Sequence, residues 1–117
     1  MKGIRGAVTV KENKADLILE AVQLLLKKMI TKNKINKKEL ISIIFTATYD
    51  LDSEYPAVAA RNMGFTDIPL MCYQEMRVNN SLKKCIRVMI YINRNCSHQD
   101  ISHVYLRKAK QLRPDLN

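Results

Sequence analysis

Residues 84–92, with the sequence KCIRVMIYI, form the clearest predicted strand of this protein. Branched apolar side chains occupy every second position, as in a β-strand whose two faces differ. We expect the apolar face to pack against a helix, and we expect Arg87, Met89 and Tyr91 to point the other way. An arginine on the second face of so apolar a strand lies either at a partly covered ligand site or against open water. The apolar set is Ile86, Val88, Ile90 and Ile92.

One long helix is predicted upstream of this strand. From Asn13 onward apolar residues recur with the helical period, and Asn13 has the side chain of an N-cap. This apolar stripe is wide enough for the helix to lie flat against a sheet. A second start signal at residues 36–39 has the spacing of a capping box and predicts a short helical turn. The stripe consists of Ile18, Ala21, Val22, Leu25 and Met29.

Four further strands and a short helix complete the expected elements. The strands are predicted at residues 3–10, 40–48, 69–73 and 103–106. Because the second of these is almost continuously apolar, we expect it in a central position with both faces covered. A short helix from Tyr55 or Pro56 to Met63 should be capped by Ser53 and ended by Gly64 in a left-handed conformation. The chain ends in LRPDL at residues 112–116, which is too irregular to predict a helix.

Together these elements predict an α+β fold in two layers, with a mixed sheet of about five strands packed against one long helix. A chain of 117 residues is long enough for one domain and too short for a catalytic domain with a regulatory one. We therefore expect a single domain over residues 1–117. One face of the sheet is left without a helix, and other copies of the same chain are its simplest cover.

The composition limits the class of protein. Apolar residues make up 47% of the sequence and charged residues 26%, as in soluble globular proteins. No apolar run approaches the roughly 18 residues that span a bilayer. Lys2 and Arg5 interrupt the region where a secretion signal would need an apolar stretch. Three cysteines without a C-x-x-C spacing favour reduced thiols, so we expect a cytoplasmic protein.

The formal charge of +9 predicts attraction to anions, which include nucleic acid, an acidic membrane surface and a small polyanionic metabolite. A basic RNA-binding domain should interleave aromatic and basic residues on exposed strands, and the sequence has no such pattern. We therefore expect a small-molecule partner, with neither a nucleic acid nor a membrane.

Residue patterns for metal, nucleophilic or phosphate-binding chemistry are missing. His98 and His103 lie five positions apart, which matches no helical ligand spacing, and neither has a cysteine neighbour suited to zinc. The nucleophile motif Gly-x-Ser-x-Gly is absent, and Gly3, Gly6 and Gly64 are too few for a phosphate loop. We expect a reaction that needs no metal and no cofactor.

Isolated arginines and one carboxylate in apolar surroundings are the main functional signal. Arginine binds carboxylates through a rigid two-pronged donor, so such a set fits a small ligand with more than one carboxylate. A surface ion pair is the alternative for any single member, and their position on different strands favours a common site. The set is Arg5, Arg61, Glu75, Arg87 and Arg113, with Tyr105 near the last in sequence.

Several segments carry a family resemblance. They are IRGA at residues 4–7, YPA at 55–57, CYQEM at 72–76, LKKCIRVM at 82–89, HVYL at 103–106 and LRPDL at 112–116. With these segments the chain resembles the monofunctional trimeric chorismate mutases of the AroH type, along its whole length and without a large insertion. The LKKCIRVM and LRPDL blocks are the most specific.

The resemblance implies a homotrimer that forms a pseudo-α/β barrel, with active sites between the subunits that rearrange chorismate to prephenate without a cofactor. It implies that Arg87 donates to the ether oxygen and to a carboxylate of chorismate. By the same resemblance Arg5 and Tyr105 hold the enolpyruvyl carboxylate, while Glu75 and Cys72 meet the ring hydroxyl.

The resemblance also implies a wall of the site that the neighbouring subunit supplies. Leu112 and Arg113 belong to a tail that is expected to close over bound ligand. Val58 stands where the family often has a lysine beside the ring carboxylate, so that contact is expected to be weaker or replaced by Arg61. The residues of the wall are Tyr55, Ala57, Arg61, Leu70 and Met71.

Two alternatives have a similar shape. A trimeric imine deaminase also places an arginine at a subunit interface, but its signature segments are absent from this sequence. An inactive relative would bind metabolites of the aromatic pathway without converting them. Loss of chorismate in the presence of the protein separates catalysis from binding alone.

Overall fold

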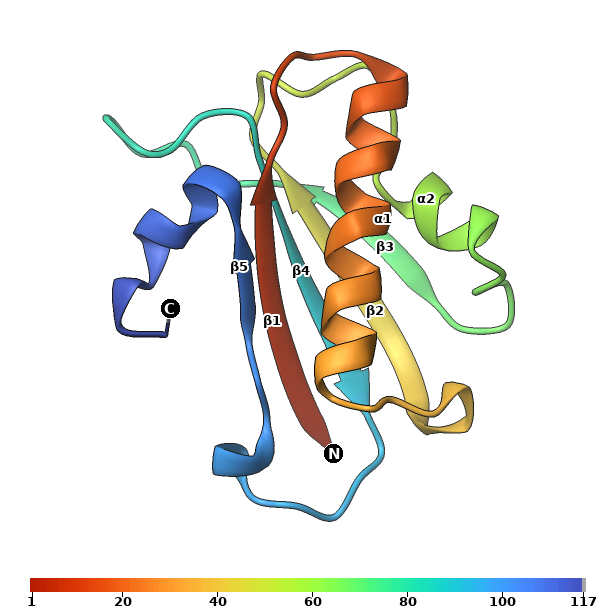
Figure 1. Ribbon diagram of the computed structural model, residues 1–117. Coiled ribbons are helices and arrows are strands. Elements are labelled where there is room, and N and C mark those ends of the chain that lie inside the picture. Colours follow the sequence, from red (N-terminus) through yellow and green to blue (C-terminus); the bar gives the residue numbers. More distant parts are fainter. Residues whose placement is uncertain (117) are drawn as a thin grey trace.

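The computed structural model describes residues 1–116. A five-stranded mixed sheet carries one long helix across one face (Figure 1). The strands are β1 (Lys2–Thr9), β2 (Leu40–Ala47), β3 (Leu70–Gln74), β4 (Cys85–Ile92) and β5 (Val104–Leu106). The helices are α1 (Ala15–Lys32) and α2 (Ala57–Asn62), with 3₁₀ helices at Lys37–Glu39, His98–Asp100, Arg107–Leu112 and Pro114–Leu116. The predicted α+β fold is confirmed.

Strand β4 is the middle of the sheet, whose order is β3-β2-β4-β1-β5. It pairs antiparallel with β1 and β2, while the outer pairs β1–β5 and β2–β3 are parallel. The predicted alternation along β4 is confirmed, because its four branched apolar residues are buried and Arg87, Met89 and Tyr91 are not. Of the candidate site residues, Arg87 lies on this strand, and Arg5 lies on the neighbouring strand β1.

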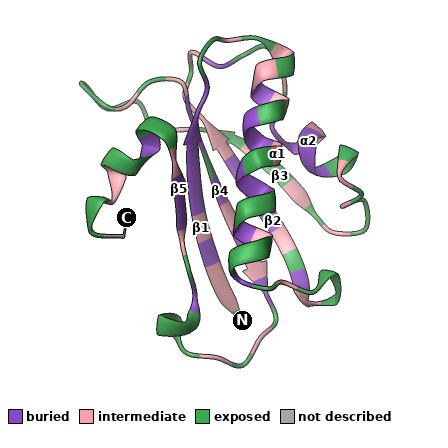
Figure 2. Ribbon diagram, viewed as in Figure 1, coloured by how far each residue is buried: buried purple, intermediate pink, exposed green. Residues whose placement is uncertain are grey.

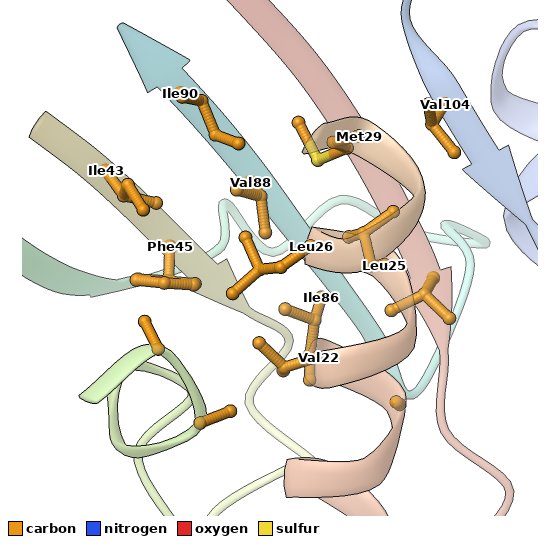
Figure 3. Close-up of a cluster of buried hydrophobic side chains, with 14 of the residues drawn as sticks. Val22, Leu25, Leu26, Met29, Ile43, Phe45, Ile86, Val88, Ile90 and Val104 are labelled. Carbon is orange, nitrogen blue, oxygen red and sulfur yellow. The ribbon is translucent and has the colours of Figure 1, made fainter. Parts of the chain in front are cut away.

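Helix α1 covers the apolar face of the sheet. Figure 3 shows Val22, Leu25, Leu26 and Met29 of the helix against side chains from β2 and β4. The side of α1 toward the sheet is buried and the outer side is exposed (Figure 2). Burial of apolar surface at roughly 25 cal/mol per Å² makes this contact the main stabilising term of the fold.

Strand β2 is an interior strand of the sheet, as predicted, but within one chain only one of its faces is well covered. Strand β2 lies second from the sheet edge, between β3 and β4. Its Ile43 and Phe45 are buried beneath the helices, whereas Ile44 and Thr46 remain partly exposed on the opposite face. Strand β2 therefore has apolar side chains on both faces, and the face away from the helices is only partly covered within one chain.

Glycine at position 6 allows α1 to approach β1 closely. A Cβ atom there would lie 2.5 Å from Sδ of Met29 and 3.1 Å from Cδ1 of Leu25. The close approach at this glycine is therefore that of packed helix side chains, and no ligand is needed to explain it.

Two predicted helix caps are wrong, and two other local signals are confirmed. The N-cap of α1 is Lys14, since the Asn13 side chain bonds to Asp52 and Ser53 in a distant loop. Ser53 does not cap α2, whose N-cap is Pro56. The capping box at Asn36 is present, and Gly64 has the left-handed φ of +95°.

The tail differs from the expectation of an irregular segment. Residues 107–112 and 114–116 form 3₁₀ helices after β5, and Ala109 of the first is buried. Short 3₁₀ turns tolerate sequences that lack the longer period of an α-helix. Within residues 1–116, no helix has the length and apolar character to cross a membrane.

Adjacent leucines of α1 test this packing. Leu25 is fully buried, so Leu25→Ala should lower the free energy of unfolding by about 2–5 kcal/mol through lost burial and the cavity left behind. The neighbouring Leu24 is 37% exposed, and Leu24→Ala should cost about 0.5 kcal/mol or less. Urea unfolding at equal protein concentration measures both. Equal losses for the two variants would contradict the assigned helix face.

Candidate active site

The strand register aligns one row of side chains on the face of the sheet away from α1. Thr46 of β2 pairs with Arg87 of β4, which pairs with Ala7 of β1, which in turn pairs with Tyr105 of β5. Paired residues in a sheet point to the same face. Ala7 itself is fully buried, in an apolar cluster that includes Tyr105.

The next residues along the strands on that face form a second row. Arg5 pairs with Met89, and Met89 pairs with Ile44. The two rows enclose a cavity of about 220 Å³, lined among others by Arg5, Thr46, Glu75, Arg87, Met89 and Tyr105. The structure therefore brings together the four predicted catalytic residues, although they come from β1, β4, β5 and the segment after β3.

An ion pair lies at one side of this cavity. Arg87 Nε is 3.1 Å from Glu75 Oε2, and the Thr46 hydroxyl donates to the same oxygen at 2.6 Å. The Glu75 backbone N–H donates to Ala47 O, which fixes the chain just beyond β3. The Arg87 side chain is 49% exposed, so the pair contributes little to stability and acts mainly to orient the guanidinium.

Tyr105 anchors the opposite side of the cavity. It is only 7% exposed and packs in a small apolar cluster with Ala7, Cys85 and Ala109. Leu112 of the tail packs against this cluster, so its position beside the site comes from apolar contact. Burial raises the pKa of the Cys85 thiol to about 11, which keeps this cysteine protonated and unreactive.

His103 holds the backbone at Arg5. Its Nδ1 accepts a hydrogen bond from the Arg5 N–H at 2.9 Å. Burial lowers the pKa of His103, and the charges of Arg5 and Arg113 lower it further. The ring is therefore neutral at pH 7, as the accepting Nδ1 requires. From the sequence, His103 was expected at most as a metal ligand, and its contact with the Arg5 backbone was not predicted.

None of the predicted wall residues lines the cavity at Arg87. Tyr55 and Cys72 line a separate cleft of about 420 Å³ between β2, β3 and the segment before α2. Ala57 is buried at the start of α2, and Arg61 is exposed on the same helix. Burial raises the pKa of the Cys72 thiol, against the opposing effects of a hydrogen bond from the Ala57 backbone and the charge of Arg61.

Cys72 does not share a face of the sheet with Arg87. It pairs with Phe45, and Phe45 pairs with Val88, so its thiol points to the helix side. Cys72 and Glu75 are predicted to contact the same ring hydroxyl. Within one chain, however, the Cys72 thiol and the Glu75 carboxylate do not line the same cavity.

The remaining predicted residues lie on β3 and in the tail. Leu70 is partly buried against the core, whereas Met71 pairs with Ile44 and is half exposed on the face of Arg87. The Arg113 guanidinium donates to both carboxylate oxygens of Asp115, at 3.1 and 2.9 Å. Residues 1–116 contain no group of three side chains that could hold a metal ion.

Comparisons with known proteins identify the family of this chain. A model of the family chorismate mutase type I matches residues 1–116. Chorismate mutase AroH of Bacillus subtilis (strain 168) is 41% identical over 118 residues, which cover 100% of this chain and 93% of the relative. Chorismate mutase AroH of Thermus thermophilus is 44% identical over 117 residues, covering 99% and 96%.

A solved structure gives the same result. The chorismate mutase from Clostridium thermocellum superposes with a TM-score of 0.92 at 52% sequence identity, over 95% of this chain and 99% of that chain. This chain belongs to the chorismate mutase type I family.

Proposed function

We propose that this protein rearranges chorismate to prephenate in aromatic amino-acid biosynthesis, without a cofactor, in the cavity that Arg87 lines. The observation that carries this assignment is the convergence of Arg5, Glu75, Arg87 and Tyr105 on one cavity of a chain from the chorismate mutase type I family. The three cysteines are free thiols, which fits the cytoplasmic location expected from the sequence.

Each group in the cavity matches one part of the substrate. Arg5 and Tyr105 bind the enolpyruvyl carboxylate, because a guanidinium and a phenol donate to carboxylate oxygens. Glu75 accepts a hydrogen bond from the ring hydroxyl. Arg87 lies between these groups and donates to the ether oxygen and to a carboxylate.

The chemistry needs no proton transfer. The C–O bond of the ether breaks while a C–C bond forms in the same molecule, so no atom leaves and no electron is exchanged with the protein. Breaking of the C–O bond runs ahead, which puts negative charge on the ether oxygen. A guanidinium already held there by Glu75 stabilises that charge without reorganisation.

Restriction of the substrate supplies a second contribution. Chorismate must bring its enolpyruvyl side chain over the ring before the new bond can form. Cations at Arg5 and Arg87 that bind separate parts of the molecule hold this compact shape and lower the entropic part of the barrier.

We also propose a homotrimer in which each site lies between two subunits. The face that carries Arg87 exposes apolar side chains, since Met71 and Tyr73 are about half exposed. A neighbouring copy that covers this face supplies Tyr55, Ala57, Arg61, Leu70 and Met71 as the far wall. Glu75 and Cys72 then meet the ring hydroxyl from two different chains, which accounts for their separation within one.

The tail completes the proposed site. Leu112 is held near Tyr105, and Arg113 is paired with Asp115 in the ligand-free chain. When chorismate binds, Arg113 exchanges this carboxylate for one of the substrate, and the tail closes over the cavity.

The direct test of function is the loss of chorismate absorbance with purified protein, with no metal or nucleotide added. Conversion to prephenate is the expected result. Binding of chorismate without its loss would identify an inactive relative and reject the assignment.

Substitution of Arg87 tests the central role. Arg87→Ala should lower kcat/KM by at least about 10²–10³-fold, because an electrostatic donor to the transition state is lost. Arg87→Lys should also be poor, since a lysine cannot donate to the ether oxygen and a carboxylate with one rigid fork. Light scattering should show unchanged assembly. A variant that keeps a substantial fraction of the rate would reject this role.

Thr46 is predicted to be a positioning residue that acts through Glu75. Thr46→Val removes the hydroxyl that donates to Glu75 Oε2 and should lower kcat about tenfold, the size expected for loss of a hydrogen bond to a charged group. Thr46→Ser keeps the hydroxyl and should retain most of the activity. A larger loss in Thr46→Ser than in Thr46→Val would show that the methyl packing, not the hydrogen bond, matters.

Mixed assemblies test the shared site. Arg87→Ala and Arg61→Ala chains should each be nearly inactive alone. After joint unfolding and refolding in equal amounts, about a quarter of the sites should combine an intact Arg87 with an intact Arg61 from another chain and regain activity. If the mixture is no more active than its components, both residues act within one chain and the interfacial site is wrong.

A further inference from the structure

A third hollow, a basic cleft, lies away from the cavity at Arg87 and from the cleft at Tyr55. It has a volume of about 570 Å³ and is formed by the end of β1, the first turns of α1, the segment before β4 and the start of the tail. None of the residues assigned above to chorismate line it. Its ionisable lining residues are Lys11, Glu20, Lys83, Lys84, Arg107 and Lys108.

The charge of this cleft is strongly positive. Five cations line it with a single carboxylate, Glu20, among the described residues. The nearby Glu12 is already paired with Lys14 at 3.0 Å. Like charges around a concave surface repel one another and raise the local potential, so a bound anion relieves an unfavourable arrangement.

Two of these cations are held in uncommon backbone conformations. Lys84 and Arg107 have φ values of +50° and +55°, a region that residues other than glycine rarely occupy. The Asp50 carboxylate fixes Lys84 by accepting its N–H at 3.0 and 3.2 Å. Residues kept in such conformations are concentrated at functional sites, where the surrounding structure supports the strain.

The side chains of the same two residues are also ordered. Arg107 Nη1 donates to Thr9 O at 3.0 Å, and Lys84 Nζ lies 3.4 Å from Lys11 O. Each keeps further N–H donors beyond the one used in these contacts. The cleft therefore presents two cations whose positions are set before a ligand arrives, which lowers the entropic cost of binding.

The base of the cleft is apolar. Val10 is buried, and Leu17 and Leu82 are partly buried beneath the basic rim. Inorganic phosphate alone would leave this surface wet. A ligand with an apolar body and one anionic group matches both parts of the cleft.

We propose that this cleft binds a small organic anion, a carboxylate or a phosphate attached to an apolar ring. The bound anion also stabilises the start of the tail. Arg107 is its first residue, and the Lys108 N–H donates to the Thr9 hydroxyl at 3.2 Å. Occupancy of the cleft thereby slows opening of the segment that leads to Leu112.

Phenyl phosphate and benzoate are suitable probes, measured by isothermal titration with Arg87→Ala protein so that the Arg87 cavity contributes little. Saturable binding of either probe is expected, tighter than that of inorganic phosphate or of uncharged benzyl alcohol. The stronger of the two probes identifies the anionic group. Hydrogen exchange of the amides at 107–112 should slow in its presence.

Variants with equal charge loss locate the binding. Lys83→Gln/Lys108→Gln should weaken binding about tenfold, since two charged contacts are removed. Lys27→Gln/Lys28→Gln removes two exposed charges of α1 that do not line the cleft and should change the dissociation constant less than about twofold. Equal weakening in both variants, or no saturable binding of either probe, would overturn the proposal.

Discussion

One face of strand β4 packs in the hydrophobic core, and the other face carries Arg87 of the proposed binding site. The branched side chains of the strand pack beneath α1, and the same backbone directs Arg87 to the face that α1 does not cover. Because β2, β1 and β5 are in register with β4, Thr46, Ala7 and Tyr105 follow Arg87 onto that face. A slip of one residue in any of these pairings would turn a functional side chain into the core. The packing of α1 therefore fixes the geometry of the site as well as the stability of the fold.

The face of the sheet away from α1 must also exclude water if Arg87 is to stabilise a negative charge strongly. A guanidinium that is half exposed to water interacts weakly with a developing negative charge, because water screens it. Covering the face with another copy of the chain buries its apolar side chains and excludes water from around Arg87. In the proposed trimer, association and catalysis therefore depend on the same surface. The proposed trimer explains why two groups of residues, one around Arg87 and one around Tyr55 and Cys72, line separate cavities in a single chain.

Local sequence predicted those features whose cause is local. The alternation in β4, the capping box at Asn36 and the left-handed Gly64 depend on neighbours within a few residues. Asn13 and Ser53 look like helix caps, but they bond to each other's loops 39 to 40 positions apart. Thr46 and His103 were missed because their partners Glu75 and Arg5 lie 29 and 98 positions away. The face of Cys72 follows from its pairing with β2, which no pattern within β3 specifies.

A crystal structure with a bound mimic of the bicyclic transition state tests the account most directly. We expect the Arg87 guanidinium to lie within hydrogen-bond distance of the ether oxygen of the mimic. Arg5 and Tyr105 should contact one carboxylate, and residues of a second chain should close the other side. A mimic bound elsewhere, with Arg87 facing bulk water, would contradict it.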